Sequence, residues 1–218
     1  AYIEALQNDA IPSSPEDYDA IARNAMRLQR LTENILDVTR IEGGKLTLRR
    51  EKFPIDEVIN SAIQDAKNQQ ANSSVMFVYE PKGLNIEADR DRISQVVYNL
   101  LTNAMKFTRE GRVTIKTFTT RNHENGNNKQ DFIIEVSDTG TGIDADIFPH
   151  LFSKFATKSE KGTGLGLFIA KSIAEAHGGT ITARNNETKG ATFTLRIPIP
   201  IDTPEIMNTD KVPETKAL

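Results

Sequence analysis

Cysteine and tryptophan are both absent from this chain of 218 residues. Without cysteine there is no disulfide, no thiolate zinc site and no cysteine nucleophile, and the redox compartment cannot be inferred. No apolar run approaches the roughly 20 residues of a membrane-spanning helix, and the N-terminus lacks the basic start and apolar core of a signal peptide. This portion is therefore predicted to be cytoplasmic, which leaves open a membrane anchor elsewhere in a parent protein.

A strong net charge is also lacking, since the formal charge is -3 at neutral pH. Nothing in this balance favours nucleic acid or an anionic membrane as the main partner, so local groups must hold any anionic ligand. Hydrophobic residues make up 38% and charged residues 26% of the chain, as is typical of a soluble globular protein. The length allows one sizeable domain with a smaller appendage.

The first part of the chain has helical periodicity. Apolar residues at 2–6 have no capping residue before them, which predicts the end of a helix whose beginning is missing. After the breaker at 11–15, apolar residues recur at steps of three and four up to Gly43 and Gly44, which predicts one amphipathic helix of about seven turns. This helix must bury its apolar stripe against the truncated helix, a second copy of the chain, or both. The alternative is a surface helix packed on its own domain.

A compact mixed unit follows from Lys45 and starts with an alternating stretch at Leu46 and Leu48. Helices are predicted at 55–66, 89–107 and 165–177, and strands at 75–79, 84–88, 112–119, 132–137, 180–184 and 191–198. The third and fourth strands form a hairpin with a long polar loop at 121–130. Helices grouped against these strands predict a two-layer α/β sandwich with a mixed sheet, and residues 201–218 are expected to be a flexible tail.

The helix predicted at 89–107 has a polar stripe opposite its apolar face. Gln95, Asn99, Asn103 and Lys106 follow one another at spacings of four, four and three. A carboxamide oxygen suits Mg²⁺, which takes one or two protein oxygens and completes its octahedron with phosphates and waters. Asn103 is therefore a candidate metal ligand and Lys106 a point charge for phosphates. Ordinary solvated polar surface is the alternative.

The segment Asp138-Thr139-Gly140-Thr141-Gly142-Ile143 directly follows an apolar run. A carboxylate at the end of a buried strand is costly unless it is paired, and the exocyclic amine of adenine would satisfy it, whereas guanine places an acceptor there. Gly140 and Gly142 allow positive φ and a close approach of the backbone to a flat ring. A plain strand-to-loop turn is the alternative.

A glycine-rich loop, Gly162-Thr163-Gly164-Leu165-Gly166-Leu167, stands immediately before a predicted helix. Clustered glycines at a helix N-terminus expose backbone N–H groups and the positive end of the dipole to phosphate. The loop is neither a Walker A loop nor a dinucleotide fingerprint. The residues before it, 152–161, suggest a mobile lid with Lys154, Lys158 and Lys161, and solvated loop charges are the equal alternative.

Four motifs in this order resemble the N, G1, F and G2 boxes of the sensor histidine kinase catalytic domain: 99–108, 138–142, 148–155 and 162–167. The resemblance covers about 56–200 and includes a closing strand motif at 190–193. Upstream, 27–42 looks like the second helix of the family's dimerisation and histidine-phosphotransfer stem. The resemblance implies a Bergerat-type ATP fold, with a partial stem at 1–44, a catalytic domain at 45–200 and the tail at 201–218.

The resemblance also implies roles for individual residues. It places Asp138 on the adenine amine, Asn103 on Mg²⁺ and Lys106 on phosphate. Thr192 would lie close to the base, and the glycine loop would form part of an ATP lid. Further ATP contacts are expected from Asn99, Phe107, Gly140, Gly142, Ile143, Lys158, Gly162, Thr163, Gly164, Leu165, Gly166 and Leu167. The implied partners are a histidine-bearing stem helix of the same or a partner chain, a response regulator and, in the full-length protein, a second copy.

Among proteins with this fold, an asparagine at position 99 fits phosphoryl transfer better than ATP hydrolysis. Hydrolytic members of the superfamily have a glutamate there to activate water, and an amide lacks the basicity for that task. A phosphoacceptor histidine in its usual context is absent, so it is expected upstream of Ala1. His123 and His150 are read as incidental, and His177 as a helix-terminal cation that favours the dipole. The alternatives are a Bergerat-fold ATPase and a non-catalytic nucleotide-binding module.

Overall fold

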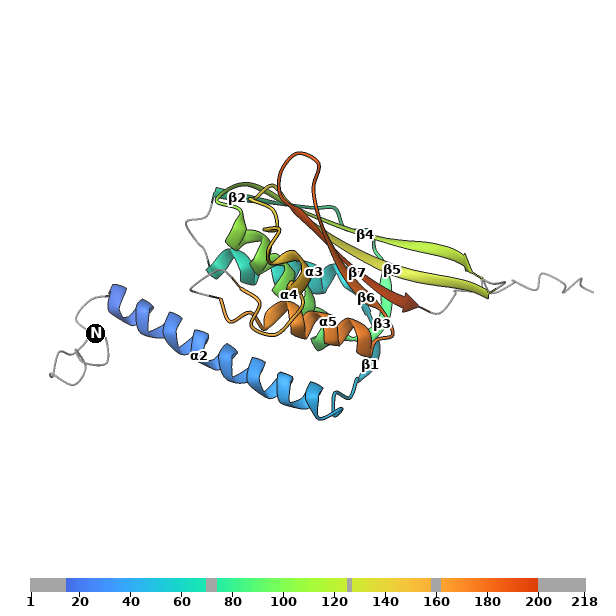
Figure 1. Cartoon of the computed structure of the whole chain (residues 1–218), viewed down its shortest axis with the longest axis horizontal. Coiled ribbons are helices and arrows are strands. Elements are labelled where there is room, and N and C mark those ends of the chain that lie inside the picture. Colours follow the sequence, from blue (N-terminus) through green and yellow to red (C-terminus); the bar gives the residue numbers. More distant parts are fainter. Residues whose placement is uncertain (1–14, 70–73, 125–126, 158–161, 200–218) are drawn as a thin grey trace, which may run out of the picture.

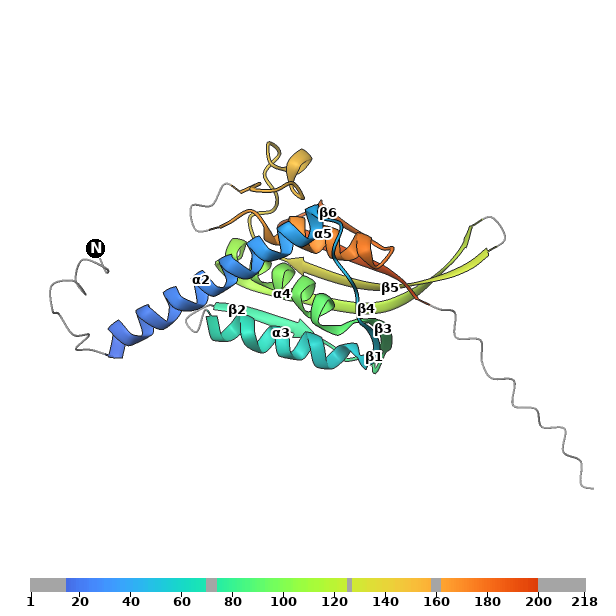
Figure 2. The same ribbon diagram turned by 90° about the horizontal axis from the view of Figure 1, so that it is seen from below.

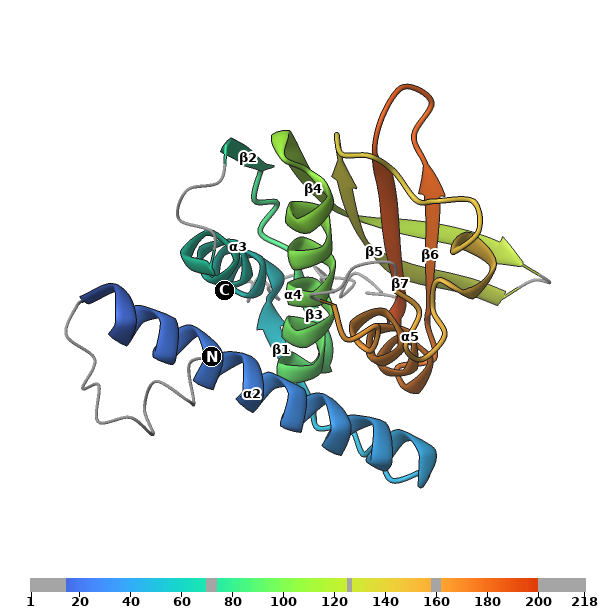
Figure 3. The same cartoon turned by 60° about the vertical axis from the view of Figure 1, so that its left-hand side comes forward.

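The structure is a computed structural model that describes residues 15–69, 74–124, 127–157 and 162–199. Five strands form a mixed sheet in the order β2 (Ser74–Tyr79), β4 (Glu110–Glu124), β5 (Asn127–Asp138), β7 (Ala191–Ile199) and β6 (Thr180–Asn185). β2 runs parallel to β4, and the other neighbouring pairs are antiparallel. One face of the sheet is covered by α3 (Ile55–Gln69), α4 (Arg90–Phe107) and α5 (Gly166–Ala176), with α4 in the middle (Figure 3). The predicted two-layer α/β sandwich is confirmed.

The core lies between this sheet and the three helices. In β5, Ile134 and Val136 are fully buried, and in β7 Leu195 is fully buried beside them. Successive residues of a strand face opposite sides of the sheet, so Asp138 lies on the helix side and Ser137 on the open side. This alternation decides which predicted site residues meet.

A second, two-stranded sheet pairs β1 (Arg50–Pro54) with β3 (Asn85–Asp89). Only Phe53 of β1 is buried, so the strand has almost no alternation to reveal it in the sequence. The alternating stretch at Leu46 and Leu48 precedes β1 and is not in a strand. β3 leads directly into α4, where the side chain of Asp89 caps the helix by accepting from the Arg92 backbone N–H at 3.1 Å.

The hairpin of β4 and β5 is longer than the sequence predicts. The polar loop expected at 121–130 is wrong, because β4 continues to Glu124 and β5 begins at Asn127. The extra residues project beyond the helical layer (Figure 1). In this extension no described helix covers either face of the two strands. An alternation of apolar residues is therefore not required, and polar residues can form the strands.

The helix α2 (Pro15–Glu42) crosses the helical layer on the side away from the sheet (Figure 2). Its C-terminal part packs on the domain through Val38 and Ile41, whereas Leu28 is 65% exposed and Ile35 is 56% exposed. The apolar stripe of α2 is thus partly packed on its own domain and partly exposed.

The predicted end of a first stem helix and the predicted tail lie outside the described residues. Within the described ranges, no helix is both long and apolar enough to span a bilayer.

A buried polar network joins α2 to α4. The Asp37 carboxylate, 6% exposed, accepts from the Arg92 guanidinium at 2.7 Å and from the Gln95 amide at 2.6 Å. Arg92 also donates to the Gln95 carbonyl oxygen at 2.9 Å. All three groups satisfy one another, so the charge on Asp37 is compensated where it is buried.

His177 differs from its interpretation as a helix-terminal cation. The residue is buried, and its Nε2 accepts a hydrogen bond from the Asp89 backbone N–H at 3.1 Å. An accepting Nε2 requires the neutral ring with the proton on Nδ1, which lies 2.8 Å from the Ile173 carbonyl oxygen. Burial lowers the pKa of His177, which agrees with a neutral ring. The side chain therefore ties α5 to the start of α4.

We expect Asp37→Ala to lower the free energy of unfolding by about 2 kcal/mol, since it leaves the partly buried Arg92 charge without its carboxylate. Urea denaturation measures this loss, and hydrogen exchange along α2 shows whether the helix detaches. Glu33→Ala is the matched control, because its carboxylate is exposed on the same helix. Equal effects of the two substitutions would contradict a role for the buried network.

Candidate functional site

Asp138 ends β5 on the helix side of the sheet and is 4% exposed. Its Oδ1 accepts from the backbone N–H groups of Gly140, at 2.8 Å, and Ala191, at 3.3 Å. Both bonds go to the same oxygen, so Oδ2 has no donor among the described residues. Burial raises the pKa of Asp138, although the two N–H donors oppose this shift. A buried carboxylate with a spare acceptor oxygen is suited to a ligand that donates a hydrogen bond.

The loop after Asp138 is held against the C-terminal end of α4. The Thr141 backbone N–H donates to the Phe107 carbonyl oxygen at 3.2 Å. A Cβ atom at Gly140 would overlap that same carbonyl, so the contact requires glycine. Gly142 has a φ of 77°, in the region that favours glycine. Phe107, 44% exposed, therefore lies beside the loop that carries Asp138 and Ile143.

The polar stripe of α4 serves two neighbours. Gln95 bonds to α2, whereas the Asn99 amide donates to the Gly166 carbonyl oxygen at 3.1 Å, at the start of α5. Asn103 is partly exposed, and its side chain has no hydrogen bond to the described residues. Partial burial lowers the pKa of Lys106, whose ammonium lies 5.2 Å from the centroid of the Phe107 ring. Asn103 and Lys106 are thus the members of the stripe available to a ligand.

The glycine-rich loop bends sharply into α5. Gly164 has a φ of 67°, and a Cβ atom there would overlap the Phe155 backbone. The Thr163 hydroxyl accepts from the Leu165 backbone N–H at 3.3 Å, and Leu165 is buried. No side chain caps the first turn of α5. The N–H groups of this turn and the positive end of the helix dipole are therefore free to meet an anion. Gly162 and Leu167, also predicted contacts, are partly exposed in the same segment.

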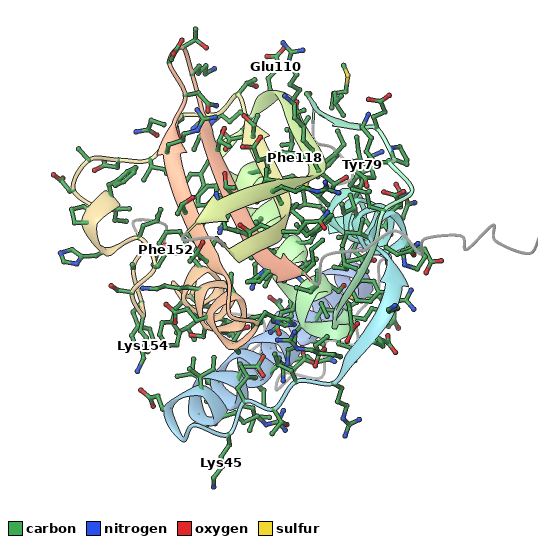
Figure 4. All side chains as sticks on the ribbon, turned by 90° about the vertical axis from the view of Figure 1, so that its right-hand side faces the viewer. Lys45, Tyr79, Glu110, Phe118, Phe152 and Lys154 are labelled. Atoms are coloured by element: carbon green, nitrogen blue, oxygen red, sulfur yellow. The ribbon has the colours of Figure 1, made fainter. Side chains whose placement is uncertain are left out.

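The described part of the segment before this loop contacts α2 through one of its lysines. Lys154 forms an ion pair with Glu42 at the end of α2, and its ammonium lies 5.3 Å from the centroid of the Phe168 ring. Figure 4 shows Lys154 extending from this segment toward the end of α2, whereas Phe152 lies farther from α2. Of the three predicted lid lysines, Lys158 and Lys161 lie outside the described residues.

The structure does not bring the side chain of Thr192 to Asp138. Thr192 is paired with Ser137, so its hydroxyl lies on the open face of the sheet, where it donates to the Asn186 side-chain oxygen at 2.7 Å and can accept from the Ser137 hydroxyl at 2.9 Å. It lines a small polar depression there with Lys116 and Arg184. The neighbouring Ala191 takes the place beside Asp138, because consecutive strand residues face opposite sides.

The remaining motifs meet at one end of the helix side of the sheet. Phe107 and Thr141 join α4 to the Asp138 loop, and Asn99 joins α4 to the glycine-rich loop. The site thus combines a buried acceptor oxygen, a helical amide, an ammonium group and an uncapped helix N-terminus. Sequence reasoning missed Ala191, Asn185 and Asn186, which also contact the Asp138 loop. Ala191 belongs to the closing strand motif at 190–193, whereas the position of Asn185 and Asn186 beside the last turn was their only signal.

Comparisons with known proteins agree with this arrangement. Residues 88–201 match the family described as Histidine kinase-, DNA gyrase B-, and HSP90-like ATPase. Sensor protein KdpD of Clostridium acetobutylicum is 35% identical over 178 residues, which cover 78% of this chain and 19% of KdpD. The chain thus spans about a fifth of that relative.

Solved structures show the same fold. The histidine kinase AdeS of Acinetobacter baumannii superposes with a TM-score of 0.72 at 22% identity, covering 91% of each chain. The catalytic domain of histidine kinase ThkA superposes with a TM-score of 0.57 at 28% identity, covering 69% of this chain and 98% of that domain.

We expect Asp138→Asn to stabilise the ligand-free protein at neutral pH. The pKa of Asp138 is higher in the folded chain than in the unfolded chain, so its contribution to stability is lost as the pH rises through the folded value. Asparagine keeps an acceptor oxygen for Gly140 and Ala191 without the buried charge. Thermal unfolding should show a gain of about 3 °C at neutral pH.

This gain should shrink toward about pH 4, where the wild-type carboxyl group is increasingly protonated. Asp65→Asn, at an exposed position on α3, is the control and should show no such trend. A variant less stable than the wild type at neutral pH would show that the charge on Asp138 is compensated within the chain.

Proposed function

Because this chain belongs to the family of histidine kinase-, DNA gyrase B- and HSP90-like ATPases and carries the catalytic ATP-binding domain of a sensor histidine kinase, we propose that it binds Mg-ATP and transfers the γ-phosphate to a histidine. The observation that carries the proposal is the buried Asp138 carboxylate with a spare oxygen, set in the same site as Asn103 and the uncapped start of α5. One end of this site suits a base and the other suits phosphates.

Asp138 would recognise the base. Its Oδ2 can accept from the exocyclic amine of adenine, whereas guanine would present a carbonyl oxygen and leave two acceptors facing each other. Gly140, Gly142 and Ile143 would place backbone against the ring, and Phe107 would add an apolar surface beside it. Desolvation strengthens this preference, because an unpaired acceptor is costly inside the protein.

Asn103 and Lys106 would act at the phosphates. Among the described residues no group of three or more His, Cys, Asp or Glu side chains is placed to hold a metal ion. A single amide oxygen from Asn103 fits Mg²⁺ that arrives with ATP, since phosphates and waters supply its other ligands. When bound, Mg²⁺ would neutralise phosphate charge. Lys106 and the backbone N–H groups of 162–167 would hold the phosphate oxygens.

Asn99 favours transfer over hydrolysis. Its amide is already engaged as a donor to Gly166, and a neutral amide cannot take a proton from water. The acceptor we propose is a histidine on the first stem helix, of the same or a partner chain, positioned in line with the γ-phosphate. The phosphate would then pass to an aspartate of a response regulator. The exposed part of the α2 stripe, including Leu28 and Ile35, is suited to pairing with stem helices of a homodimer. Such a reaction would take place in the cytoplasm, where ATP is available.

The test supplies the stem helix that bears the histidine, joined to this chain or as a separate fragment, together with labelled ATP. A kinase of this class places acid-labile, base-stable label on that helix. Multiple-turnover ADP release without a protein acceptor would favour an ATPase instead. Absence of Mg-dependent ATP binding would favour a non-catalytic module.

We expect Asn103→Ala to abolish Mg-dependent phosphotransfer while the fold stays intact, because the substitution removes the only protein oxygen proposed for the cation. Phosphotransfer to the added stem helix and circular dichroism measure the two effects. Asn60→Ala removes an exposed amide from α3 and is the matched control. Transfer retained by the Asn103 variant would exclude it as an essential ligand.

Asp138→Asn should weaken ATP binding by about 10- to 100-fold, the effect of losing one hydrogen bond to a charged group in a buried site. The asparagine amide would hydrogen-bond less strongly and can turn a donor toward the adenine amine. Calorimetric titration with Mg-ATP measures the affinity. An unchanged dissociation constant would remove adenine recognition from Asp138.

A further inference from the structure

Asn185, the last residue of β6, holds the far end of the Asp138 loop. Its side-chain oxygen accepts from the Ile143 backbone N–H at 2.7 Å, and its amide donates to the Ile143 carbonyl oxygen at 3.0 Å. One side chain thus satisfies both backbone groups of one loop residue, as a neighbouring strand would. A Cβ atom at Gly142 would stand 2.9 Å from the Asn185 side-chain oxygen, and the φ of 77° at Gly142 also favours glycine.

Asn186 holds the near end of the same loop. Its amide donates to the Asp138 carbonyl oxygen at 3.0 Å and to the Ser137 hydroxyl at 3.3 Å. The amide also donates to the Lys189 carbonyl oxygen at 3.2 Å, and the Asn186 side-chain oxygen accepts from Thr192. The side chain therefore joins the end of β5 to the turn between β6 and β7.

The two asparagines act from opposite faces of the sheet. Consecutive side chains at a strand end point to opposite sides, so Asn185 reaches the loop on the helix side and Asn186 reaches Ser137 and Thr192 on the open side. Between them, a Cβ atom at Gly190 would overlap the Asp138 carbonyl, which shows how closely the turn approaches β5. Both ends of the segment from Asp138 to Ile143 are fastened by side chains outside it.

We propose that Asn185 and Asn186 are positioning residues that aim the Asp138 carboxylate and the following loop at the base, and so determine selectivity for adenine. The inference rests on the proposed function. Discrimination by a single hydrogen bond depends on where its acceptor stands, and a displacement of about 1 Å is enough to lose most of it. Neither asparagine needs to touch the nucleotide, so each acts through the loop.

The experiment compares Asn185→Ala and Asn185→Asp with the wild-type chain. The aspartate keeps the shape and an acceptor for the Ile143 N–H, but it cannot donate to the Ile143 carbonyl oxygen. Dissociation constants for Mg-ATP and Mg-GTP are measured by calorimetry, and thermal unfolding is measured in parallel. Glu187→Ala, at an exposed position in the same turn, is the matched control.

We expect both Asn185 variants to lose about tenfold of the ATP-over-GTP preference. ATP binding should weaken while GTP binding stays as it is, with Glu187→Ala unchanged. A purely structural role would weaken both nucleotides together, in step with the unfolding temperature, and would overturn the inference. Variants that keep the wild-type ratio of ATP affinity to GTP affinity would also overturn the inference. A wild-type chain without any preference for ATP would instead reject the proposed function itself.

Asn186→Asp extends the test to the open face. It removes the donor to the Asp138 carbonyl oxygen while keeping the acceptor for Thr192, so the preference for ATP should fall in the same direction.

Hydrogen exchange at the Ile143 amide gives a readout independent of nucleotide. It should accelerate in Asn185→Ala and stay slow in Glu187→Ala, and equal exchange in the two would contradict the proposed fastening of the loop.

Discussion

The arrangement depends on one buried carboxylate that the chain satisfies only in part. Asp138 lies at the end of a central strand, where two backbone N–H groups bond to one of its oxygens and leave the other without a donor among the described residues. Neighbouring glycines are required for this geometry, because a Cβ atom at Gly140 or Gly190 would overlap backbone that holds the loop. Burial of this carboxylate raises its pKa and costs stability at neutral pH, because no cation in the described part of the chain compensates the charge. Perturbed pKa values of this kind are concentrated at functional sites.

The helix α4 connects this carboxylate to the rest of the molecule. Its apolar face is buried in the core, its C-terminal end contacts the Asp138 loop, and Asn99 contacts the start of α5. One turn before Asn99, Gln95 shares the Asp37 carboxylate of α2 with Arg92. The long helix and the site therefore contact the same helix, α4. The Lys154–Glu42 ion pair is a second contact, between the end of α2 and the segment before the glycine-rich loop.

The sequence was sufficient where residues obey a strong period or a local motif. Helices, most strands and the sandwich followed from apolar spacing, and the grouping of Asn99, Asp138 and the glycine-rich loop followed from motif order. Prediction from the sequence failed where a feature depends on contacts between distant parts of the chain. β1 was missed because only one of its side chains is buried, and the hairpin was predicted too short because its ends extend past the core. His177 was predicted to be a cation, but it is neutral because β3 packs on it. Thr192 faces the open side because of strand register, which no spacing within one strand reveals.

We propose that one site holds the base at Asp138 and the phosphates near Asn103 and α5. A crystal structure of the chain with Mg²⁺ and a non-hydrolysable ATP analogue is the decisive measurement. We expect the adenine amine within hydrogen-bond distance of Asp138 Oδ2, the Asn103 oxygen on the cation and the phosphates beside residues 162–167. A nucleotide bound with its base away from Asp138, or phosphates far from the start of α5, would contradict it.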